Sequence, residues 1–502
     1  MAATLHAPQE PRARISAKQG WALATLVLPV LLISIDMTVL GFAVPFLSED
    51  LAPTSSQLLW IVDVYGFVLA GLLVTMGTLG DRVGRRKLLV IGSAAFAVAS
   101  VLAAYAPSAE ALIAARALLG LAGATLMPTT LALMRNLFHD DRQRKFAIAI
   151  WASGFSAGAA LGPILGGWLL EHFWWGSVFL MAAPVSIAVV LAAPFLLPES
   201  KDPNPGRIDV PSVALSFLAM FPFVYGVKTI AEHGVTVATV AAIAAGAVAG
   251  MWFVRRQKRL EHPLIDVGLF RLRRFSASLA TNFTIVFAMI SALFLLTQYL
   301  QLVLGFSPMQ AGLLLLPGMV VSVVSGLFAV RMSERTGMVR TIIAGLVLVI
   351  AGFAAMTFIG IDSGAAVVAS AFALIGAGSG LAQTVTNDAI LAAAPADRAG
   401  AASAISETAY ELGGAMGVAL LGSLATGIYR TEMADAPVEA ETLGEAAHVA
   451  ATLPAETGDA LMEAARTAFT DGLRTVALVA AALVLIATVA VGRALRTRSS
   501  ER

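Results

Sequence analysis

Long apolar runs alternate along the chain with short segments that are charged or rich in glycine and proline. A run of about twenty apolar residues is long enough to cross a bilayer as a helix. We find no ten-residue alternation of the kind that predicts a membrane β-barrel. The pattern therefore predicts an all-α membrane protein with fourteen transmembrane helices. The expected spans are 21–47, 58–79, 88–106, 111–134, 146–170, 176–197, 210–230, 236–254, 276–303, 310–330, 341–360, 365–391, 402–428 and 472–492.

The distribution of lysine and arginine orients these helices. With the N-terminus placed inside, 28 of the 33 basic residues fall in inner loops and tails. Lys228, Arg430, Arg466 and Arg474 lie outside or at an outer helix end, and Arg116 lies within a span. Cytoplasmic loops carry such an excess of positive charge. With an arginine-rich composition typical of GC-rich bacteria, this predicts a multi-pass protein of the bacterial cytoplasmic (inner) membrane, with both termini cytoplasmic.

Composition narrows the possible functions. Charged residues make up 13% of the chain, against about a quarter in soluble domains. The chain has no cysteine, which excludes disulfides and cysteine-based zinc sites. It also lacks the phosphate-binding loop of ATP-driven pumps and any nucleophile elbow. We therefore expect a secondary active transporter and not an enzyme, with no cofactor, no metal and no nucleic-acid partner.

The spans divide into six, two and six. We expect a cytoplasmic tail (1–20), an N-terminal six-helix bundle (21–200), two extra transmembrane helices (201–259), a C-terminal six-helix bundle (260–495) and a short cytoplasmic tail (496–502).

One outer segment, 430–471, is long. Residues 431–470 hold eight acids and one base, a net charge of −7. Leu461, Ala465 and Phe469 recur at helical spacing, which predicts a small helical hairpin. The segment is either a solvated cap or an electrostatic lure for cations.

A charged loop with several glycines follows the second span. It reads Gly77-Thr-Leu-Gly-Asp81-Arg82-Val-Gly84-Arg85-Arg86-Lys87. Glycine lets two helix ends approach closely, and Asp81 can cap a neighbouring helix or pair with an arginine across the bundle interface. A copy without the aspartate follows the tenth span, at 326–337. Internal repeats of this kind are typical of secondary transporters, which bind their substrates near the membrane midplane.

The fifth span carries a face of small residues. It reads Gly154-Phe-Ser-Ala-Gly158-Ala-Ala-Leu-Gly162-Pro163-Ile-Leu-Gly166-Gly167. Small residues four apart let membrane helices pack closely, and proline bends a helix. The same spacing occurs in many membrane proteins, so by itself it predicts only close packing.

Taken together, these motifs resemble those of the fourteen-span drug:proton antiporters of the major facilitator superfamily, in particular the QacA- and LfrA-type multidrug exporters. The resemblance extends over residues 20–495 and includes Asp36 in the first span and Arg116 in the fourth. It implies the major facilitator fold, with two six-helix bundles plus two extra helices. It also implies that the loop from Gly77 is a conformational latch and that the fifth span holds the antiporter motif of exporters.

Few ionisable residues fall within the predicted spans, where a charge costs several kcal/mol. They are Asp36, Asp63, Arg116, Asp388, Glu407 and Glu411. Asp63 and Asp388 lie near span ends, where either can be merely interfacial. Glu407, Tyr410 and Glu411 share one helix face. Two carboxylates so close in a low dielectric cannot both ionise freely, so one is expected to hold a proton.

These residues give a candidate site. We assign proton coupling to Asp36, Glu407 and Arg116, although Asp36 and Arg116 can also be a purely structural ion pair. The predicted substrate-binding residues are Asp63, Glu411, Tyr410, Trp60, Tyr65, Phe42, Phe294 and Tyr299, because carboxylates and aromatic faces bind organic cations. Any single aromatic residue can instead be packing filler.

The resemblance and the buried acids lead to one functional hypothesis. The chain is expected to be a proton-coupled multidrug efflux antiporter that works by alternating access. Its expected substrates are lipophilic cations: quaternary ammonium compounds, dyes such as ethidium, and fluoroquinolones. The alternative is an exporter or flippase of lipids or other hydrophobic metabolites with the same fold. The expected partners are protons, cationic drugs and membrane lipid, and the protein is expected to be a monomer.

Overall fold

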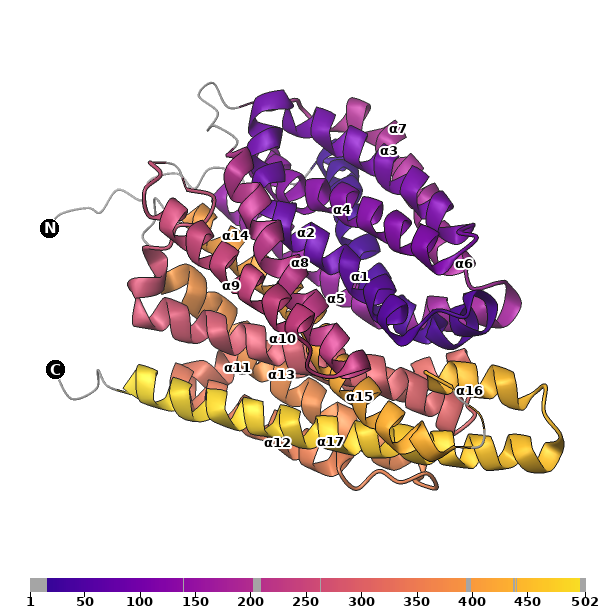
Figure 1. Cartoon of the computed structure of the whole chain (residues 1–502). Helices are drawn as coiled ribbons and strands as arrows, with labels where there is room; N and C mark the ends of the chain where they lie inside the picture. Colours follow the sequence, from indigo (N-terminus) through magenta and orange to yellow (C-terminus); the bar gives the residue numbers. More distant parts are fainter. Residues whose placement is uncertain are drawn as a thin grey trace, which may run out of the picture.

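The computed structural model describes residues 16–138, 140–201, 209–261, 263–393, 399–436, 438 and 440–496. Within these residues the chain is helical and contains no strand (Figure 1). Fourteen helical segments there are long and apolar enough to cross a membrane, which confirms the predicted all-α fold and span number.

The helices of the first bundle are α1 (Ala17–Leu51), α2 (Ser55–Val83), α3 (Arg85–Ala104), α4 (Ala109–Leu137), α5 (Asp141–His172), and α6 (Ser177–Leu180) with α7 (Ala182–Leu196). The extra pair is α8 (Val210–His233) and α9 (Val237–Gln257). The second bundle holds α10 (Arg273–Gln298), α11 (Pro308–Thr336), α12 (Met338–Met356), α13 (Ala365–Ala393), α14 (Ala399–Gly417), α15 (Ser423–Glu432) and α17 (Ala455–Arg496). Short π-helical segments continue α10 (Tyr299–Val303) and join α14 to α15 (Val418–Gly422), and α16 (Leu443–Ala450) lies in the long loop.

Several spans begin where the sequence supplies a helix cap. The Thr54 hydroxyl accepts a hydrogen bond from the Gln57 backbone N–H, and the Gln57 side chain accepts one from the Thr54 N–H. Ser307 and Gln310 form the same reciprocal pair at the start of α11. Such capping boxes satisfy backbone groups that the first helical turn leaves without partners. The capping boxes therefore determine the residues at which α2 and α11 begin.

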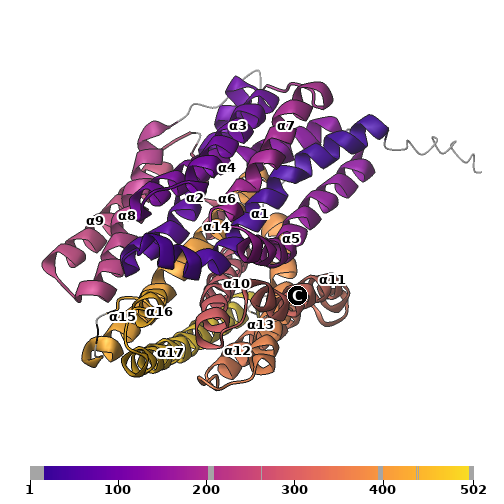
Figure 2. The same cartoon turned by 90° about the vertical axis from the view of Figure 1, so that its right-hand side faces the viewer.

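The two ends of the molecule are distinct. The last turns of α17 lie at one end and α16 at the other (Figure 1). Because fourteen spans run back and forth, α1 begins at the same end as α17 finishes; we call this the terminal end, and the opposite one the far end. The extra helices α8 and α9 pack on each other, and α8 also contacts α2 and α15 (Figure 2).

Several of the described contacts between the two bundles lie toward the far end. A Cβ on Gly312 of α11 would meet the backbone oxygen of Pro163 on α5 at 2.7 Å, and one on Gly167 would meet Met309 Cα at 2.6 Å. Between α1 and α10, the Thr297 hydroxyl donates to the Gly41 carbonyl oxygen over 3.2 Å. The small residues thus let the bundles touch backbone to backbone in this half.

The same helix α5 packs closely on α1 within the first bundle. A Cβ on Gly158 would lie 2.7 Å from the Leu31 carbonyl oxygen, and the Ser34 hydroxyl donates to the Phe155 carbonyl oxygen over 2.6 Å. The glycine face predicted from sequence therefore serves two contacts, one toward α1 and one toward α11.

The long loop forms the predicted helical hairpin. It consists of α16 and the first turns of α17, where Leu461 and Ala465 are fully buried. The last span was predicted to begin at 472, but α17 begins at Ala455, because no proline interrupts the helix and its apolar stripe continues across the loop. At the far end of α2, the Ser55 hydroxyl donates to the Glu441 carbonyl oxygen over 2.9 Å. The hairpin thus contacts the first bundle while it belongs to the second.

The packing of α5 on α1 gives a stability prediction. We expect Gly158→Ala to destabilise the protein by about 1 to 3 kcal/mol, because the new methyl group must displace backbone. The matched control is Gly20→Ala, where a Cβ meets nothing within 4 Å and alanine favours the helix by about 0.5 to 1 kcal/mol. Thermal unfolding of the purified variants in detergent measures both. An equal melting temperature for the two variants would contradict the close contact.

Candidate functional site

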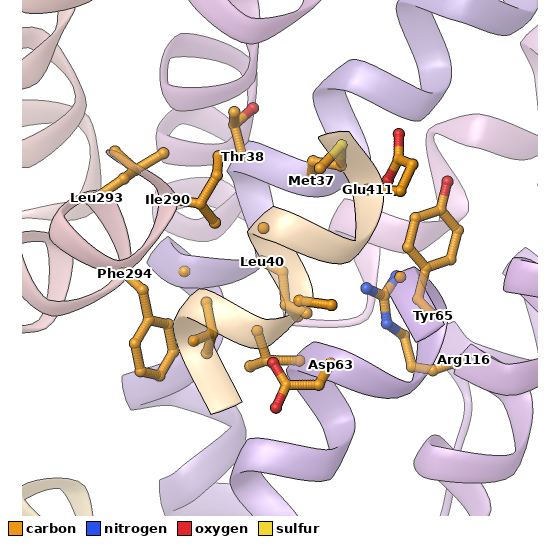
Figure 3. Close-up of a pocket in the computed structure, with 16 residues that line it drawn as sticks. Met37, Thr38, Leu40, Asp63, Tyr65, Arg116, Ile290, Leu293, Phe294 and Glu411 are labelled. Carbon is orange, nitrogen blue, oxygen red and sulfur yellow. The ribbon is translucent and has the colours of Figure 1, made fainter. Parts of the chain in front are cut away.

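A cavity lies between the two bundles (Figure 3). Its described lining comprises Met37, Thr38, Leu40, Gly41, Val62, Asp63, Tyr65, Gly66, Arg116, Ile290, Leu293, Phe294, Glu411, Gly414, Ala415 and Val418. In Figure 3, Glu411, Tyr65 and Arg116 lie on one side, and Ile290, Leu293 and Phe294 on the other. The cavity is therefore polar on the side where residues of α2, α4 and α14 meet and apolar on the side of α10.

The cavity is narrow. Its volume is about 50 Å³. Pockets that bury drug-sized ligands are commonly about 300 to 1,000 Å³. The bundles must therefore separate further before a drug-sized molecule fits between them.

Asp36 and Arg116 form a buried ion pair beside this cavity. Arg116 Nη1 lies 2.6 Å from Asp36 Oδ2, and Arg116 Nε donates to the Ile61 carbonyl oxygen over 3.1 Å. The guanidinium also stands over the Tyr65 ring, 4.6 Å from its centroid. These contacts compensate the guanidinium charge and tie α1, α2 and α4 together. The structure thus contains the ion pair that the sequence left as an alternative reading of Asp36.

Glu411 differs from Asp36 because no cation is paired with it in the part of the chain that the structure describes. Its side chain is 1% exposed, and neither carboxyl oxygen has a hydrogen-bond partner among the described residues. Glu407 lies one turn earlier on α14 and is partly exposed, while the Tyr410 ring packs edge-on against Phe155 with centroids 5.3 Å apart. A carboxylate charge without a partner is costly at such depth. This position therefore favours a proton or a cation.

Asp63 is fully buried, and its partner was missed by the sequence analysis. Lys228 Nζ of α8 lies 2.8 Å from Asp63 Oδ2, and both side chains have 0% exposure. The ammonium also lies 4.3 Å from the centroid of the Trp60 ring. Lys228 lies two residues before the end of the apolar span Val210–Ile230, and α8 itself continues to His233. A lone lysine inside an otherwise apolar run was the signal that could have found this pair.

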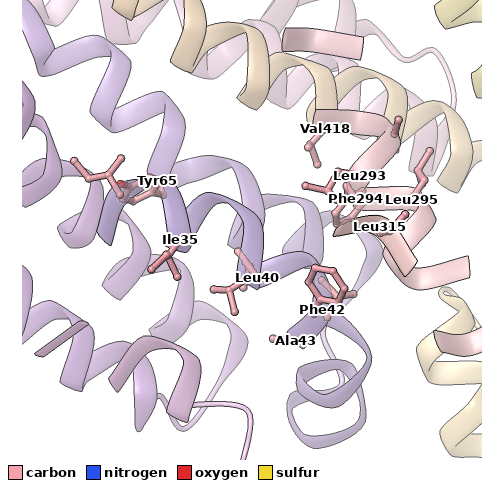
Figure 4. Close-up of a cluster of buried hydrophobic side chains, with 14 of the residues drawn as sticks. Ile35, Leu40, Phe42, Ala43, Tyr65, Leu293, Phe294, Leu295, Leu315 and Val418 are labelled. Atoms are coloured by element: carbon pink, nitrogen blue, oxygen red, sulfur yellow. The ribbon is translucent and has the colours of Figure 1, made fainter. Parts of the chain in front are cut away.

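The other predicted aromatic residues fall into two groups. Tyr65 and Phe294 line the cavity. Phe42 packs inside the main apolar cluster (Figure 4), and Tyr299 is fully buried, with its hydroxyl donating to the Gly360 carbonyl oxygen over 2.5 Å. In this conformation, then, Phe42 and Tyr299 support the fold at the far end and do not face the cavity. Asp388 is exposed near the end of α13.

The loop between α2 and α3 is held within the first bundle. Arg85 Nη2 lies 2.6 Å from Asp81 Oδ1, so the partner of Asp81 among the described residues is in the same loop. The Arg86 backbone N–H donates to Glu199 Oε1 over 3.1 Å, beyond the end of α7. Gly84 has φ +114°, and Gly337 has φ +88° at the corresponding turn between α11 and α12. The repeated turn supports the internal repeat predicted from sequence.

The comparison with known proteins decides the family. A family model described as Major Facilitator Superfamily matches residues 26–418 of the chain. The chain belongs to the major facilitator superfamily. This transporter is 51% identical over 488 residues to the multidrug efflux pump LfrA of Mycolicibacterium smegmatis, which covers 95% of the chain and 97% of the relative. It is 34% identical over 461 residues to the methyl viologen resistance protein SmvA of Salmonella typhimurium, covering 90% and 93%.

Solved structures agree on the fold. One is a bacterial homolog of the human lysosomal transporter Spinster, in an inward-facing and unoccupied conformation. It has a TM-score of 0.65 and 16% identity to this transporter and covers 95% of the chain and 98% of the structure. At that identity the likeness concerns the fold alone. The predicted major facilitator fold and the resemblance to drug exporters of this superfamily are confirmed. The protein is a multi-pass membrane transporter and not an enzyme.

The buried Asp36 and Arg116 pair gives a second prediction. We expect Arg116→Met to destabilise the transporter by about 3 to 5 kcal/mol, because it leaves a buried carboxylate without its counter-charge. The double variant Asp36→Asn with Arg116→Met should recover most of this loss.

The matched control is Arg85→Met, whose pair with Asp81 is about a quarter exposed. An exposed pair of this spacing contributes about 0.3 to 0.5 kcal/mol, so its melting temperature in detergent should change little. Equal losses at Arg116 and Arg85, or no recovery in the double variant, would contradict the role given to burial.

Proposed function

We propose that this transporter exports lipophilic organic cations in exchange for protons. The observation that carries the proposal is Glu411, a buried carboxyl that lines an aromatic and apolar cavity and has no hydrogen-bond partner among the described residues. A proton and an organic cation can each neutralise such a group, and the two then exclude one another. Mutually exclusive binding at one carboxyl is the elementary requirement for antiport.

The names of the relatives support the substrate class. LfrA is named as a multidrug efflux pump, and SmvA for resistance to methyl viologen, an organic dication. A third relative, 32% identical over 508 residues, is the tetracenomycin C resistance and export protein of Streptomyces glaucescens. We infer from this similarity, and from the acids and aromatic rings of the cavity, that this chain also exports drugs.

The proposed cycle is alternating access in the bacterial inner membrane, with the terminal end facing the cytoplasm and the protein acting as a monomer. The bundle contacts at Gly312 and Gly167 close the far end, so the state described favours loading from the terminal end. Protons arriving from outside bind among Asp36, Glu407 and Glu411 and release the cation outward. Arg116, which pairs with Asp36 and contacts α2, would transmit the protonation of the acids to the packing of the first bundle.

The membrane potential sets a requirement on the number of protons. Export of one monovalent cation against an inside-negative 100 mV costs about 2.3 kcal/mol, and each tenfold of accumulation adds about 1.4 kcal/mol. Exchange for one proton cancels only the electrical part. Two protons would let the potential contribute, and the buried acids provide more than one site for them.

The test is ethidium efflux from loaded cells, with and without a protonophore. We expect the wild type to export ethidium only while the proton gradient lasts. Glu407→Gln and Glu411→Gln should lose gradient-driven efflux, because a glutamine cannot exchange a proton.

Glu261→Gln is the control, since this exposed glutamate lies in the loop before α10 and should transport as the wild type does. Efflux that continues in the protonophore would overturn proton coupling. Absence of ethidium transport under any gradient would favour the export of lipid or another hydrophobic, uncharged substrate.

A further inference from the structure

The extra helix α8 places a positive charge against the wall of the cavity. Asp63 lines the cavity, whereas Lys228 is not among the described residues that line it. The ammonium therefore reaches Asp63 from behind the wall, over 2.8 Å. A carboxylate at 2.8 Å and the face of Trp60 at 4.3 Å surround this ammonium. Together they have the composition of a site for an organic cation.

Close packing holds this arrangement in place. The Trp60 ring stacks on Phe221 of α8, with centroids 5.8 Å apart and planes at 15°. A Cβ on Gly71 of α2 would lie 2.9 Å from the Phe217 ring, and one on Gly226 would lie 2.9 Å from the Thr239 carbonyl oxygen of α9. The lysine is thus delivered by a helix that contacts both α2 and α9 at short range.

The α8 and α9 hairpin is also closed at its terminal end. Arg256 Nη2 lies 2.7 Å from Asp209 Oδ1, and Gln257 Nε2 donates to the Ser212 hydroxyl over 2.7 Å. The hydrogen bonds from Arg256 lower the pKa of Asp209 below its usual value. The hairpin is therefore tied at its terminal end and closely packed at Gly226, so a displacement of Lys228 requires movement of its long side chain or of the whole pair of helices.

We propose that Lys228 is a tethered counter-cation, which occupies the cation site of Asp63 and thereby sets how many positive charges a substrate can carry into the cavity. This inference rests on the proposed function. With Lys228 in place, Glu411 is the acid open to a substrate charge. A second substrate charge would need Asp63, whose charge the ammonium already compensates. A specificity device of this kind rejects a ligand by leaving one of its charges without a partner.

The probes are ethidium and propidium, which share a phenanthridinium ring and carry one and two positive charges. Binding is measured by fluorescence on the purified full-length protein in detergent. We expect Lys228→Met to lower the Kd for propidium about tenfold and to change that for ethidium much less, because it frees the Asp63 carboxylate for the second charge. Lys228→Arg keeps the cation and should show no gain.

Two further variants identify Asp63 as the origin of the gain. Lys228→Met with Asp63→Asn should lose the preference for propidium, since no carboxylate remains. Asp63→Asn alone leaves an ammonium beside the cavity and should weaken ethidium binding about tenfold, and the double variant should restore it. Because the double variant replaces a buried ion pair by neutral groups, it is expected to fold. The comparison of Asp63→Asn with the double variant therefore tests the proposal even where Lys228→Met fails to fold.

The outcomes separate this inference from the proposed function. Wild-type protein that binds neither dye would overturn the export of such cations. Wild-type protein that binds ethidium, with no gain for propidium in Lys228→Met and equal ethidium affinities in Asp63→Asn and the double variant, would overturn the role of Lys228 alone. Lys228 would then serve only to join α8 to α2 through its ion pair with Asp63. Lys258→Met, which removes an exposed lysine just beyond α9, is the control for a general effect of lost positive charge.

Discussion

A charge in the low-dielectric interior of this transporter is costly in free energy, and this cost determines which groups surround each buried acid. Each acid between its helices must have a cation, a proton or water to be tolerated. Asp36 has Arg116 and Asp63 has Lys228, and both pairs join helices that are distant in sequence. Glu411 has neither a cation at bonding distance nor a hydrogen-bond partner among the described residues. The two pairs join α4 to α1 and α8 to α2, and under the proposed function the remaining acid, Glu411, would bind a proton or the substrate cation. Asp36 and Asp63, which have a basic partner, thus have a structural role, whereas Glu411, which has none among the described residues, is an acid proposed to act in transport.

The glycines of α5 provide the second constraint. This helix packs on α1 through Gly158 and on α11 through Gly167 and Pro163, so it belongs firmly to the first bundle while it touches the second. Contacts made by backbone atoms without intervening side chains can be broken and remade without rotamer rearrangement. That property suits the proposed alternating-access cycle, in which the two bundles would move relative to one another.

The sequence predicts the architecture well because membrane spans are specified locally. Length and apolarity identify each helix, and the capping residues Thr54 and Ser307 fix two of the starts. The site is only partly predictable. Asp36, Asp63, Arg116 and Glu411 stand out as charges in apolar runs, and the structure brings the last three and Tyr65 to one cavity. Which cation faces which acid depends on helix rotation and on packing between distant segments, which no periodicity encodes. The pairing of Lys228 with Asp63 was therefore not predicted. Phe42 and Tyr299 could not be told from residues that face the cavity.

The hairpin of α16 and α17 has an energetic consequence for the whole molecule. It is covalently part of the second bundle, yet Ser55 of the first bundle donates to its Glu441, and Gly444 lies so close to Ser48 that a Cβ there would stand 2.8 Å away. Any separation of the bundles at the far end must first break these contacts. In the proposed alternating-access cycle, these contacts would stabilise the state that is closed at the far end relative to the state that is open there, so the hairpin would influence the balance between the two.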